Sequence, residues 1–404
     1  MKLTDRIKAA TGIIIRGRNL REPIGFSPRL SSDIGERVGE AEVLGMSAVW
    51  ACCNLLSGTI SSLPLMVYKN IDGRRQVDVD HPLYRILHNS PNFDQTALDF
   101  WDFTVRSVEL WGNSYAEISR NSGVVTGLSP INPDTMKVSR SESGALQYEW
   151  KVGQATYKKP DTDILHVRGF GGAPLGGLSV LHFARNSFGG ARAVEKSSSA
   201  MFANRMSPGG VLTFQNFLSD ENRKIAEDRL TQKFVGALND GRPMILEGGT
   251  KWEPITINPD DAQMLETRRF SVEDICRFFN VPPQLIGHTE KSSSIGTGIE
   301  QQTLAFQKFT LRPRIKRIEQ ALMQQLLTPD DIAAGVVVEF NIDGLLRGDS
   351  KSRSDFYNAG LLGGWLNINE IRKRENMEPV DGGDVNRTQM QNVPIAEIQN
   401  GNDD

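Results

Sequence analysis

The chain has 404 residues, of which 39% are hydrophobic and 24% are charged. These proportions are ordinary for a folded globular protein, and the length exceeds the roughly 250–300 residues at which a single core usually stops growing. Two or more packed units are therefore expected. The net charge of −3 and the pI of about 6.1 exclude a protein that grips DNA tightly over its whole surface, because such proteins carry a basic surplus. Local contact with DNA stays possible.

The cysteines and the N-terminus indicate where the protein is made. Cys52, Cys53 and Cys276 have no CxxC spacing, and adjacent cysteines rarely pair with each other. This usage is typical of the reducing cytoplasm. The apolar run Ile13–Ile15 is too short for a signal peptide or a membrane span. We therefore expect a soluble protein that is made inside a cell and has no membrane partner.

The first 45 residues show weak periodicity and predict an irregular, partly mobile arm. An amphipathic helix is then predicted up to Pro64, and a second helix over 96–111 with Trp101, Val105 and Val108 on one face. The apolar positions of the first helix recur at three- and four-residue steps: Met46, Val49, Trp50, Cys53, Leu56, Ile60 and Leu63.

Beyond these helices the period of the apolar residues changes to two. Strands are predicted over Ser114–Ser119 and Asp163–Arg168, and a third over 146–152, where Leu146, Tyr148, Trp150 and Val152 alternate with polar residues. Residues 46–175 are thus expected to form a first α+β unit.

A long helix is predicted over 178–206, and it is rich in small residues, including the pair Gly189-Gly190. Two glycines inside a helix cost about 1 kcal/mol each relative to alanine, so close approach of a neighbouring helix is one expected reason for them. The alternative is that the helix breaks at this pair.

A small αβ insert follows the helix. It is predicted to contain a strand at Val211–Phe214, a helix over about 220–238, and a hairpin that joins Pro243–Glu247 to Lys251–Ile257. A second long helix, over about 261–279, has Leu265, Val272, Ile275, Cys276 and Phe279 on its apolar face. Two long helices are therefore expected to bracket the insert.

The segment 285–298 is a polar loop with one lysine, Lys291. A helix is predicted from about 299 to 327, kinked at Pro313 because proline removes a backbone hydrogen bond. Its expected apolar face is Leu304, Leu311, Ile315, Ile318, Leu322 and Leu326. A strand at Val336–Asn341, one or two short helices up to about 378 and a polar tail over 381–404 complete the prediction.

The sequence shows no established catalytic or metal-binding motif. The nearest match to a phosphate-binding loop, Gly190–Ser197, has Glu195 where the loop needs glycine, and it falls inside a predicted helix. The histidines are dispersed. The pairs Asp260-Asp261 and Asp330-Asp331 stand where helices are predicted to begin, a position that favours acids without any metal. We expect no enzymatic activity, no cofactor and no bound metal.

One charge feature contrasts with the mildly acidic chain. The segment 291–317 contains six basic residues and a single acidic residue, Glu300. The basic residues are Lys291, Lys308, Arg312, Arg314, Lys316 and Arg317. The last four fit a solvated helix face, or pairing with acids of a neighbouring subunit, at least as well as DNA contact. Lys291 sits among hydroxyls, with Ser292, Ser293, Ser294 and Thr297 close by. Such a loop is suited to touching a phosphate backbone without reading bases.

Several ordered stretches carry a family likeness: the run from Met46 to Pro64, His81-Pro-Leu, Gly112-Asn-Ser-Tyr115, Gly176–Leu181, Pro282–Gly287, Leu366–Arg372 and Glu378-Pro379. Their order and spacing closely resemble the portal proteins of tailed phages, in the branch of long-tailed phages with the common tailed-phage coat fold. The likeness runs from about 45 to 380.

The resemblance implies an α+β portal fold, with an arm (1–45), a wing (46–177), stem helices (178–209 and 259–284) around a clip (210–258), a tunnel loop (285–298), a kinked helix with inner wing and short crown (299–380), and a polar tail (381–404). It implies a closed ring of about twelve identical subunits at one capsid vertex, with double-stranded DNA in the channel. The implied partners are the terminase large subunit, the major capsid protein or scaffold, and a head-completion adaptor. The implied location is the virion, with the host cytoplasm during assembly.

Two rival interpretations have different sequence requirements. A phage nuclease or ATPase needs acidic clusters or a phosphate-binding loop, and this chain shows neither. A head-to-tail adaptor is also ring-forming, but adaptors are usually shorter and lack two helices around an inserted clip.

Overall fold

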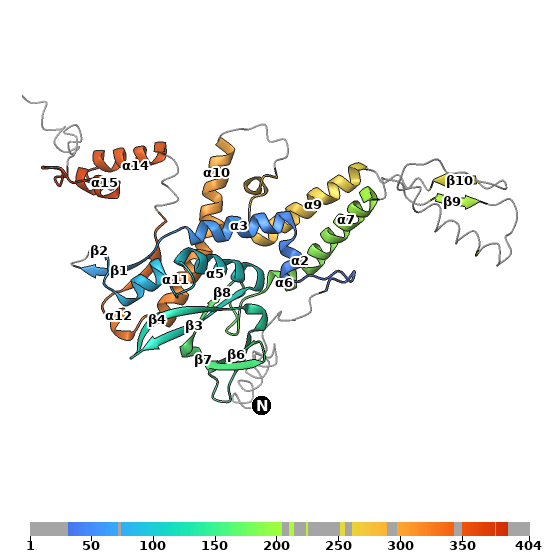
Figure 1. Cartoon of the computed structure of the whole chain (residues 1–404). Coiled ribbons are helices and arrows are strands. Elements are labelled where there is room, and N and C mark those ends of the chain that lie inside the picture. The colour runs from blue at the N-terminus through green and yellow to red at the C-terminus, as the bar shows by residue number, and fades with distance from the viewer. Residues whose placement is uncertain are drawn as a thin grey trace, which may run out of the picture.

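The computed structural model describes residues 31–71, 74–203, 210–213, 224, 251–254, 261–288, 297–342, 350–375 and 377–386. Helices and strands form a central body (Figure 1), which confirms the mixed fold class. Two long helices, α7 (Arg185–Ala203) and α9 (Asp261–Phe279), leave this body side by side. They lead to a pair of strands, β9 (Gly210–Thr213) and β10 (Lys251–Pro254). Two further helices, α14 and α15, lie at the opposite side of the body.

Two packed helices form the centre of the body, as predicted. Helix α3 (Ser47–Ser61) packs on α5 (Ala97–Trp111), and most of the expected apolar face of α3 is buried. Trp50 was wrongly placed on that face, because its side chain is 60% exposed. Helix α5 begins with a Thr96–Asp99 capping box, which satisfies backbone N–H groups at its first turn.

The strands of the described residues form several small antiparallel sheets. β1 (Leu65–Ile71) lies between β2 (Arg74–Val77) and β11 (Val337–Phe340), with Leu65 opposite Phe340. The unit predicted at 46–175 is therefore not closed, because it shares a sheet and a core with residues from the C-terminal part of the chain.

Two other sheets complete the body. β3 (Asn113–Asn121) lies between β4 (Val124–Ile131) and β8 (Ile164–Arg168), and β6 (Leu146–Val152) lies between β5 (Lys137–Arg140) and β7 (Ala155–Pro160). Tyr148 and Trp150 are buried in a second, smaller core, as their alternation predicted, whereas Val152 is exposed. The shorter elements of the body are α2 (Glu40–Leu44), α4 (Pro82–Tyr84), η1 (Arg85–Asn89), η2 (Pro133–Thr135), η3 (Asp161–Asp163), α6 (Val180–Phe183), η4 (Pro283–Ile286) and α12 (Pro329–Ala333).

The first long helix differs from its prediction at its start. A short helix, α6, ends at Phe183, and α7 then runs unbroken through Gly189-Gly190, so the predicted alternative of a break at the glycines is wrong. A Cβ at Gly189 would lie 2.3 Å from the Cβ of Ser32. Gly189 thus admits the chain's own N-terminal segment, whereas a Cβ at Gly190 would meet no atom of this chain within 4 Å.

That N-terminal segment is more ordered than predicted. Residues 31–45 contain helix α2 and the buried side chains of Val38 and Val43. Lys196 of α7 pairs with Glu36 at 2.6 Å, which fixes the segment along the helix. The part of the predicted arm from 1 to 30 lies outside the described residues.

The insert between the long helices is described only in its strands. β9 (Gly210–Thr213) pairs antiparallel with β10 (Lys251–Pro254). The predicted partner strand at 243–247 and nearly all of the predicted helix over 220–238 lie outside the described residues.

The C-terminal part contains the predicted long helix, but in divided form. The long helix is divided into α10 (Thr297–Ala305), a π-helical segment η5 (Phe306–Leu311) and α11 (Arg312–Leu326). The apolar face from Leu311 to Leu326 is buried, but Leu304 is 56% exposed, contrary to prediction. The two short helices are α14 (Ser350–Leu362) and α15 (Ile368–Arg374), and most of the predicted tail, 387–404, lies outside the described residues.

Leu56 and Trp50 offer a matched test of this packing, because both lie on α3. We predict that Leu56→Ala lowers the free energy of unfolding by about 2–5 kcal/mol, since the side chain is fully buried and its loss leaves a cavity. Trp50→Ala should change it by less than about 1 kcal/mol, because most of that side chain already meets solvent. Urea unfolding followed by circular dichroism measures both, and equal losses would contradict this packing.

Candidate functional site

The residues predicted to touch DNA fall into two groups in the structure. Lys291 and Ser292–Ser294 lie outside the described residues, and Thr297 is the first residue of α10. The connection that carries them joins η4, which follows the end of α9, to α10. Lys308 and Arg312 are described and exposed, and the ammonium of Lys308 lies 5.5 Å from the ring centroid of Phe309.

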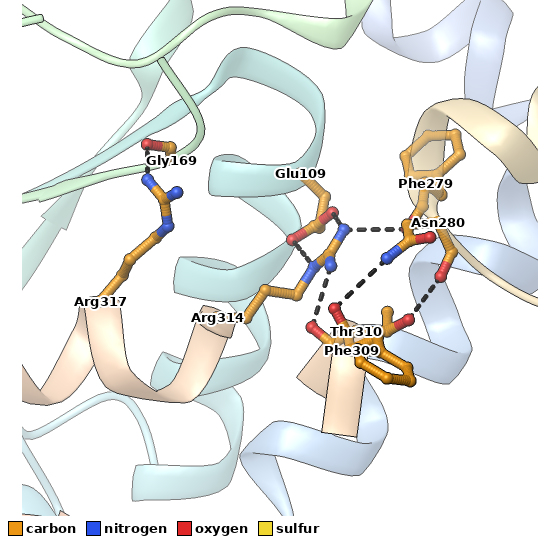
Figure 2. Close-up of polar contacts among 8 residues, drawn as sticks. All are labelled: Glu109, Gly169, Phe279, Asn280, Phe309, Thr310, Arg314 and Arg317. Carbon is orange, nitrogen blue, oxygen red and sulfur yellow. Dashed lines mark hydrogen bonds and ion pairs between the residues drawn. The ribbon is translucent and has the colours of Figure 1, made fainter. Parts of the chain in front are cut away.

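Arg314 belongs to the interior of the subunit (Figure 2). Its Nε donates to Oε1 of Glu109 at 2.7 Å, and its Nη2 donates to Oε2 at 2.8 Å. The side chain of Glu109 is 7% exposed and that of Arg314 is 20% exposed. A bidentate pair of this kind is the strongest geometry available to a guanidinium and a carboxylate. The expectation that Arg314 is available to DNA is therefore corrected, because its charge is matched inside the chain.

The same guanidinium also reaches the end of α9. Nη2 donates to the carbonyl oxygen of Phe279 at 2.8 Å, and Nη1 donates to that of Thr310 at 3.0 Å. Both are carbonyls near helix ends or irregular turns, which lack a full set of intrahelical partners. Arg314 thus joins α5, the last residue of α9 and the π-helical segment η5 at one point.

Pro313 explains why this point needs side-chain partners. Proline has no N–H, so the carbonyl of Phe309, four residues earlier, receives no α-helical hydrogen bond from it. Asn280 Nδ2 donates to that carbonyl at 3.4 Å, and the hydroxyl of Thr310 donates to the carbonyl of Asn280 at 2.6 Å. The predicted irregularity is confirmed, and it takes the form of the π-helical turn before the proline. We call Glu109, Phe279, Asn280, Thr310 and Arg314 the junction.

Two further basic residues of α11, Lys316 and Arg317, also have partners within the chain. Lys316 pairs with Glu319 at 2.7 Å and with Glu339 at 3.3 Å. The hydrogen bond to Glu319 raises the pKa of Lys316, so the side chain keeps its charge. Arg317 donates to the carbonyl of Gly169. These acids of the same chain balance the charge of Lys316, so neither the predicted DNA contact nor an acid of a neighbouring subunit is needed to balance it.

The motif Gly112–Tyr115 holds the segment before the first long helix. Gly112 has φ +72°, and a Cβ there would lie 2.3 Å from the carbonyl oxygen of Leu178, so only glycine fits. Asn113 Oδ1 accepts from the N–H of Gly177 at 2.8 Å and lies 2.9 Å from Nε2 of His166. Burial lowers the pKa of His166 well below its usual value, so the ring is neutral and its Nε2 donates to Asn113.

The cysteine thiols and the possible metal ligands of the described residues also bear on whether a reactive site is present. Cys52, Cys53 and Cys276 are buried, and burial raises the pKa of Cys53 to about 12, which leaves no reactive thiolate at this position. In the described part of the chain no three acidic, histidine or cysteine residues are placed to hold a metal ion. No described helix is long and apolar enough to cross a membrane.

Sequence reasoning missed Glu109, although a signal was present. Glu109 follows Trp101 by eight residues and Val105 by four, so it lies on the buried face of α5. A carboxylate on such a face needs a buried cation or several donors. Arg314 was assigned outward because helix periodicity alone cannot show which acid it faces.

Comparison with known proteins decides the family. Residues 47–376 match the family model described as phage portal protein, which is more than half of the chain. The chain belongs to the phage portal protein family. It is 38% identical over 366 residues to the portal protein of Enterobacteria phage HK97, covering 89% of this chain and 85% of that protein. It is 32% identical over 387 residues to the probable portal protein of Streptomyces phage phiC31, covering 93% and 84%.

Solved structures share the portal fold. The crystal structure of an HK97-family phage portal protein from Corynebacterium diphtheriae aligns with a TM-score of 0.58 at 21% identity, covering 77% of this chain and 99% of that one. The neck of an empty gene transfer agent particle, computed with C6 symmetry, aligns with a TM-score of 0.59 at 23% identity, covering 85% and 92%. The same neck in a native particle, computed with C12 symmetry, gives 0.56 at 23% identity, covering 84% and 92%.

The junction of this portal protein is tested by removing one partner of its buried pair. We predict that Arg314→Ala lowers the free energy of unfolding by about 3–5 kcal/mol, because Glu109 is left buried and unpaired. Lys159→Ala breaks an exposed pair with Glu117 and should cost at most about 1 kcal/mol. Urea unfolding measures both, and a loss below 1 kcal/mol for Arg314→Ala would show that the junction does not hold these elements together.

Proposed function

We propose that this chain is the portal subunit that forms a closed ring of about twelve copies at one capsid vertex, with a central channel for DNA packaging and ejection. Family membership and the extended helix pair carry the proposal: α7 and α9 leave the body together, and the strands at their far end have no place in the core of the body. The symmetric neck structures that share the fold give independent support.

The proposed layout follows the elements. α6–α7 and α9 form the stem (178–209 and 259–284), β9 and β10 belong to the clip (210–258), and 285–298 is the tunnel loop. Residues 46–177 form the wing, and the chain after 299 forms the kinked helix, the inner wing and a short crown. In this layout the clip docks the terminase large subunit and later a head-completion adaptor, while the wing faces the major capsid protein or scaffold.

Weak cationic contact suits a channel through which duplex DNA slides. Each firm phosphate contact releases counterions and makes binding steeply salt-dependent, so many firm contacts oppose sliding. Among the predicted cations, Arg314 and Lys316 are matched by acids of their own subunit. Lys291 in the tunnel loop, assisted by Ser292–Ser294 and Thr297, and the exposed Lys308 and Arg312 are therefore the proposed contacts.

An enzymatic role finds no support in the described residues. Burial lowers the pKa of His166, so its ring is neutral and hydrogen-bonded to Asn113. No three acidic, histidine or cysteine side chains among the described residues are placed to hold a metal ion. We propose a non-enzymatic protein without a cofactor, located in the virion and, during assembly, in the host cytoplasm.

Two measurements test this function. Electron microscopy of the purified protein should show rings with an open channel, and a population of compact monomers would overturn the proposal.

Lys291→Ala, tested by DNA packaging and retention in assembled particles, should reduce the yield of full-length packaged DNA. Lys158→Ala, which removes an exposed lysine of β7, is the matched control and should package like the wild type. Equal packaging by both variants would remove Lys291 from the channel mechanism.

A further inference from the structure

A fully exposed aromatic side chain projects from a braced loop before α5. Phe93 is 107% exposed. The loop beneath it is held by Asn92, whose Nδ2 donates to the carbonyl of Leu128 at 2.9 Å and whose Oδ1 accepts from the N–H of Asp94 at 2.9 Å. The apolar surface of Phe93 contributes nothing inside the subunit, and it is available for burial against a partner surface.

Two acidic residues follow this aromatic side chain closely in the sequence. Leu98, on the first turn of α5, is also exposed, and Asp94 and Asp99 beside it are exposed carboxylates. Asp99 caps the helix through Thr96, and that hydrogen bond lowers the pKa of Asp99, so it stays charged. We call Phe93, Asp94, Leu98 and Asp99 the knob.

An apolar cavity of about 520 Å³ lies at the other end of α5. Its walls include Val108, Leu178, Phe183, Phe278 and Pro313. A cavity of this size is within the range that accepts a large side chain with its neighbours. The subunit itself does not fill it, and Phe183 is half exposed at its wall.

Arginines line the cavity alongside these apolar residues: Arg168, Arg277, Arg314 and Arg317. Arg168 and Arg317 form no ion pair in the described part of the chain, and Nε of Arg168 is buried without a hydrogen-bond partner. Arg314 is paired with Glu109, and Arg277 is paired with Glu273 and Asp274 on its own helix. The cavity therefore presents apolar walls together with the unpaired charges of Arg168 and Arg317.

The knob lies at the start of α5, and the cavity is lined by residues 105–109 in its last turns, so the two are about 12–18 Å apart along the helix axis. A surface and its complement at separate places on one subunit give a head-to-tail contact, which is the kind that closes into a ring. We propose that the knob of each subunit inserts into the cavity of the next copy of this chain, with Phe93 against the apolar walls and Asp94 near Arg277 and Arg317. This inference rests on the proposed ring.

Aromatic side chains in fully desolvated pockets dominate interface energies, and complementary charge fixes their register. We expect Phe93→Asp to reduce the fraction of protein in rings at least tenfold at equal concentration, as counted by native mass spectrometry. Its circular dichroism should match the wild type, because the side chain makes no contact in the isolated subunit. Val79→Asp, which alters another exposed apolar side chain, is the control and should leave ring formation unchanged.

Crosslinking tests the contact directly. In rings of the double variant Asp94→Cys with Arg277→Cys, a short bismaleimide should give a ladder of covalent multimers. The control is the double variant Asp80→Cys with Arg277→Cys, and the yield of multimers should be at least tenfold lower there. The native cysteines are buried and should not contribute. Rings with crosslinking only at the control level would overturn the knob contact and assign the cavity to another occupant, while the ring itself stands. Wild-type protein that forms no rings would overturn the ring and this inference together.

Discussion

The arrangement of this portal subunit depends on one backbone defect, the missing N–H of Pro313. Because the carbonyl of Phe309 loses its α-helical partner, it is free to accept from elsewhere, and Nδ2 of Asn280 donates to it at 3.4 Å. Asn280 is the residue directly after α9, so a group at the end of one helix meets the defect in another. The π-helical turn and the end of α9 are connected by this hydrogen bond and by the one that the Thr310 hydroxyl donates to the carbonyl of Asn280.

The ion pair between Arg314 and Glu109 adds orientation to this connection. A buried ion pair contributes little net stability, because desolvation of both charges offsets most of their attraction. Its geometry is nevertheless demanding, since a guanidinium that serves two carboxylate oxygens and two carbonyls at once tolerates little rotation. The pair thus fixes how α5, α9 and α11 meet. In a ring subunit, small changes in such angles are multiplied around the circle, so accurate orientation matters more than added stability.

Local pattern was enough to predict the elements whose burial follows their own periodicity. The strand over 146–152 and the helix over 261–279 have the predicted limits, because alternation and helical spacing report directly on which face is buried. The π-helical turn was only indirectly visible, since proline shows that a bond is missing but not how the helix adjusts. Thr297 could be placed at the start of α10, whereas its neighbours 291–294 lie outside the described residues.

Features that join distant segments were beyond local pattern. The pairing of β1 with β11 connects Leu65 to Phe340, and no period in either strand names its partner. The close approach of Ser32 to Gly189 and the burial of Arg314 by Glu109 have the same character. Gly189 was expected to admit a neighbouring helix, and Arg314 was expected on a solvated helix face, against an acid of a neighbouring subunit, or at DNA. The physical reason is that the type of a small or charged residue indicates which kind of partner it needs, but not where in the sequence that partner lies.

The fixed junction also limits where the proposed DNA contact can be. Gly287 ends η4 with φ +80°, and His288 is half-buried beside it, so the segment 289–296 starts from a defined place near α9. Lys291 follows His288 by three residues in the sequence. In the proposed ring, a contact made by Lys291 would therefore depend on the described segment that precedes it, which α9 and η4 position.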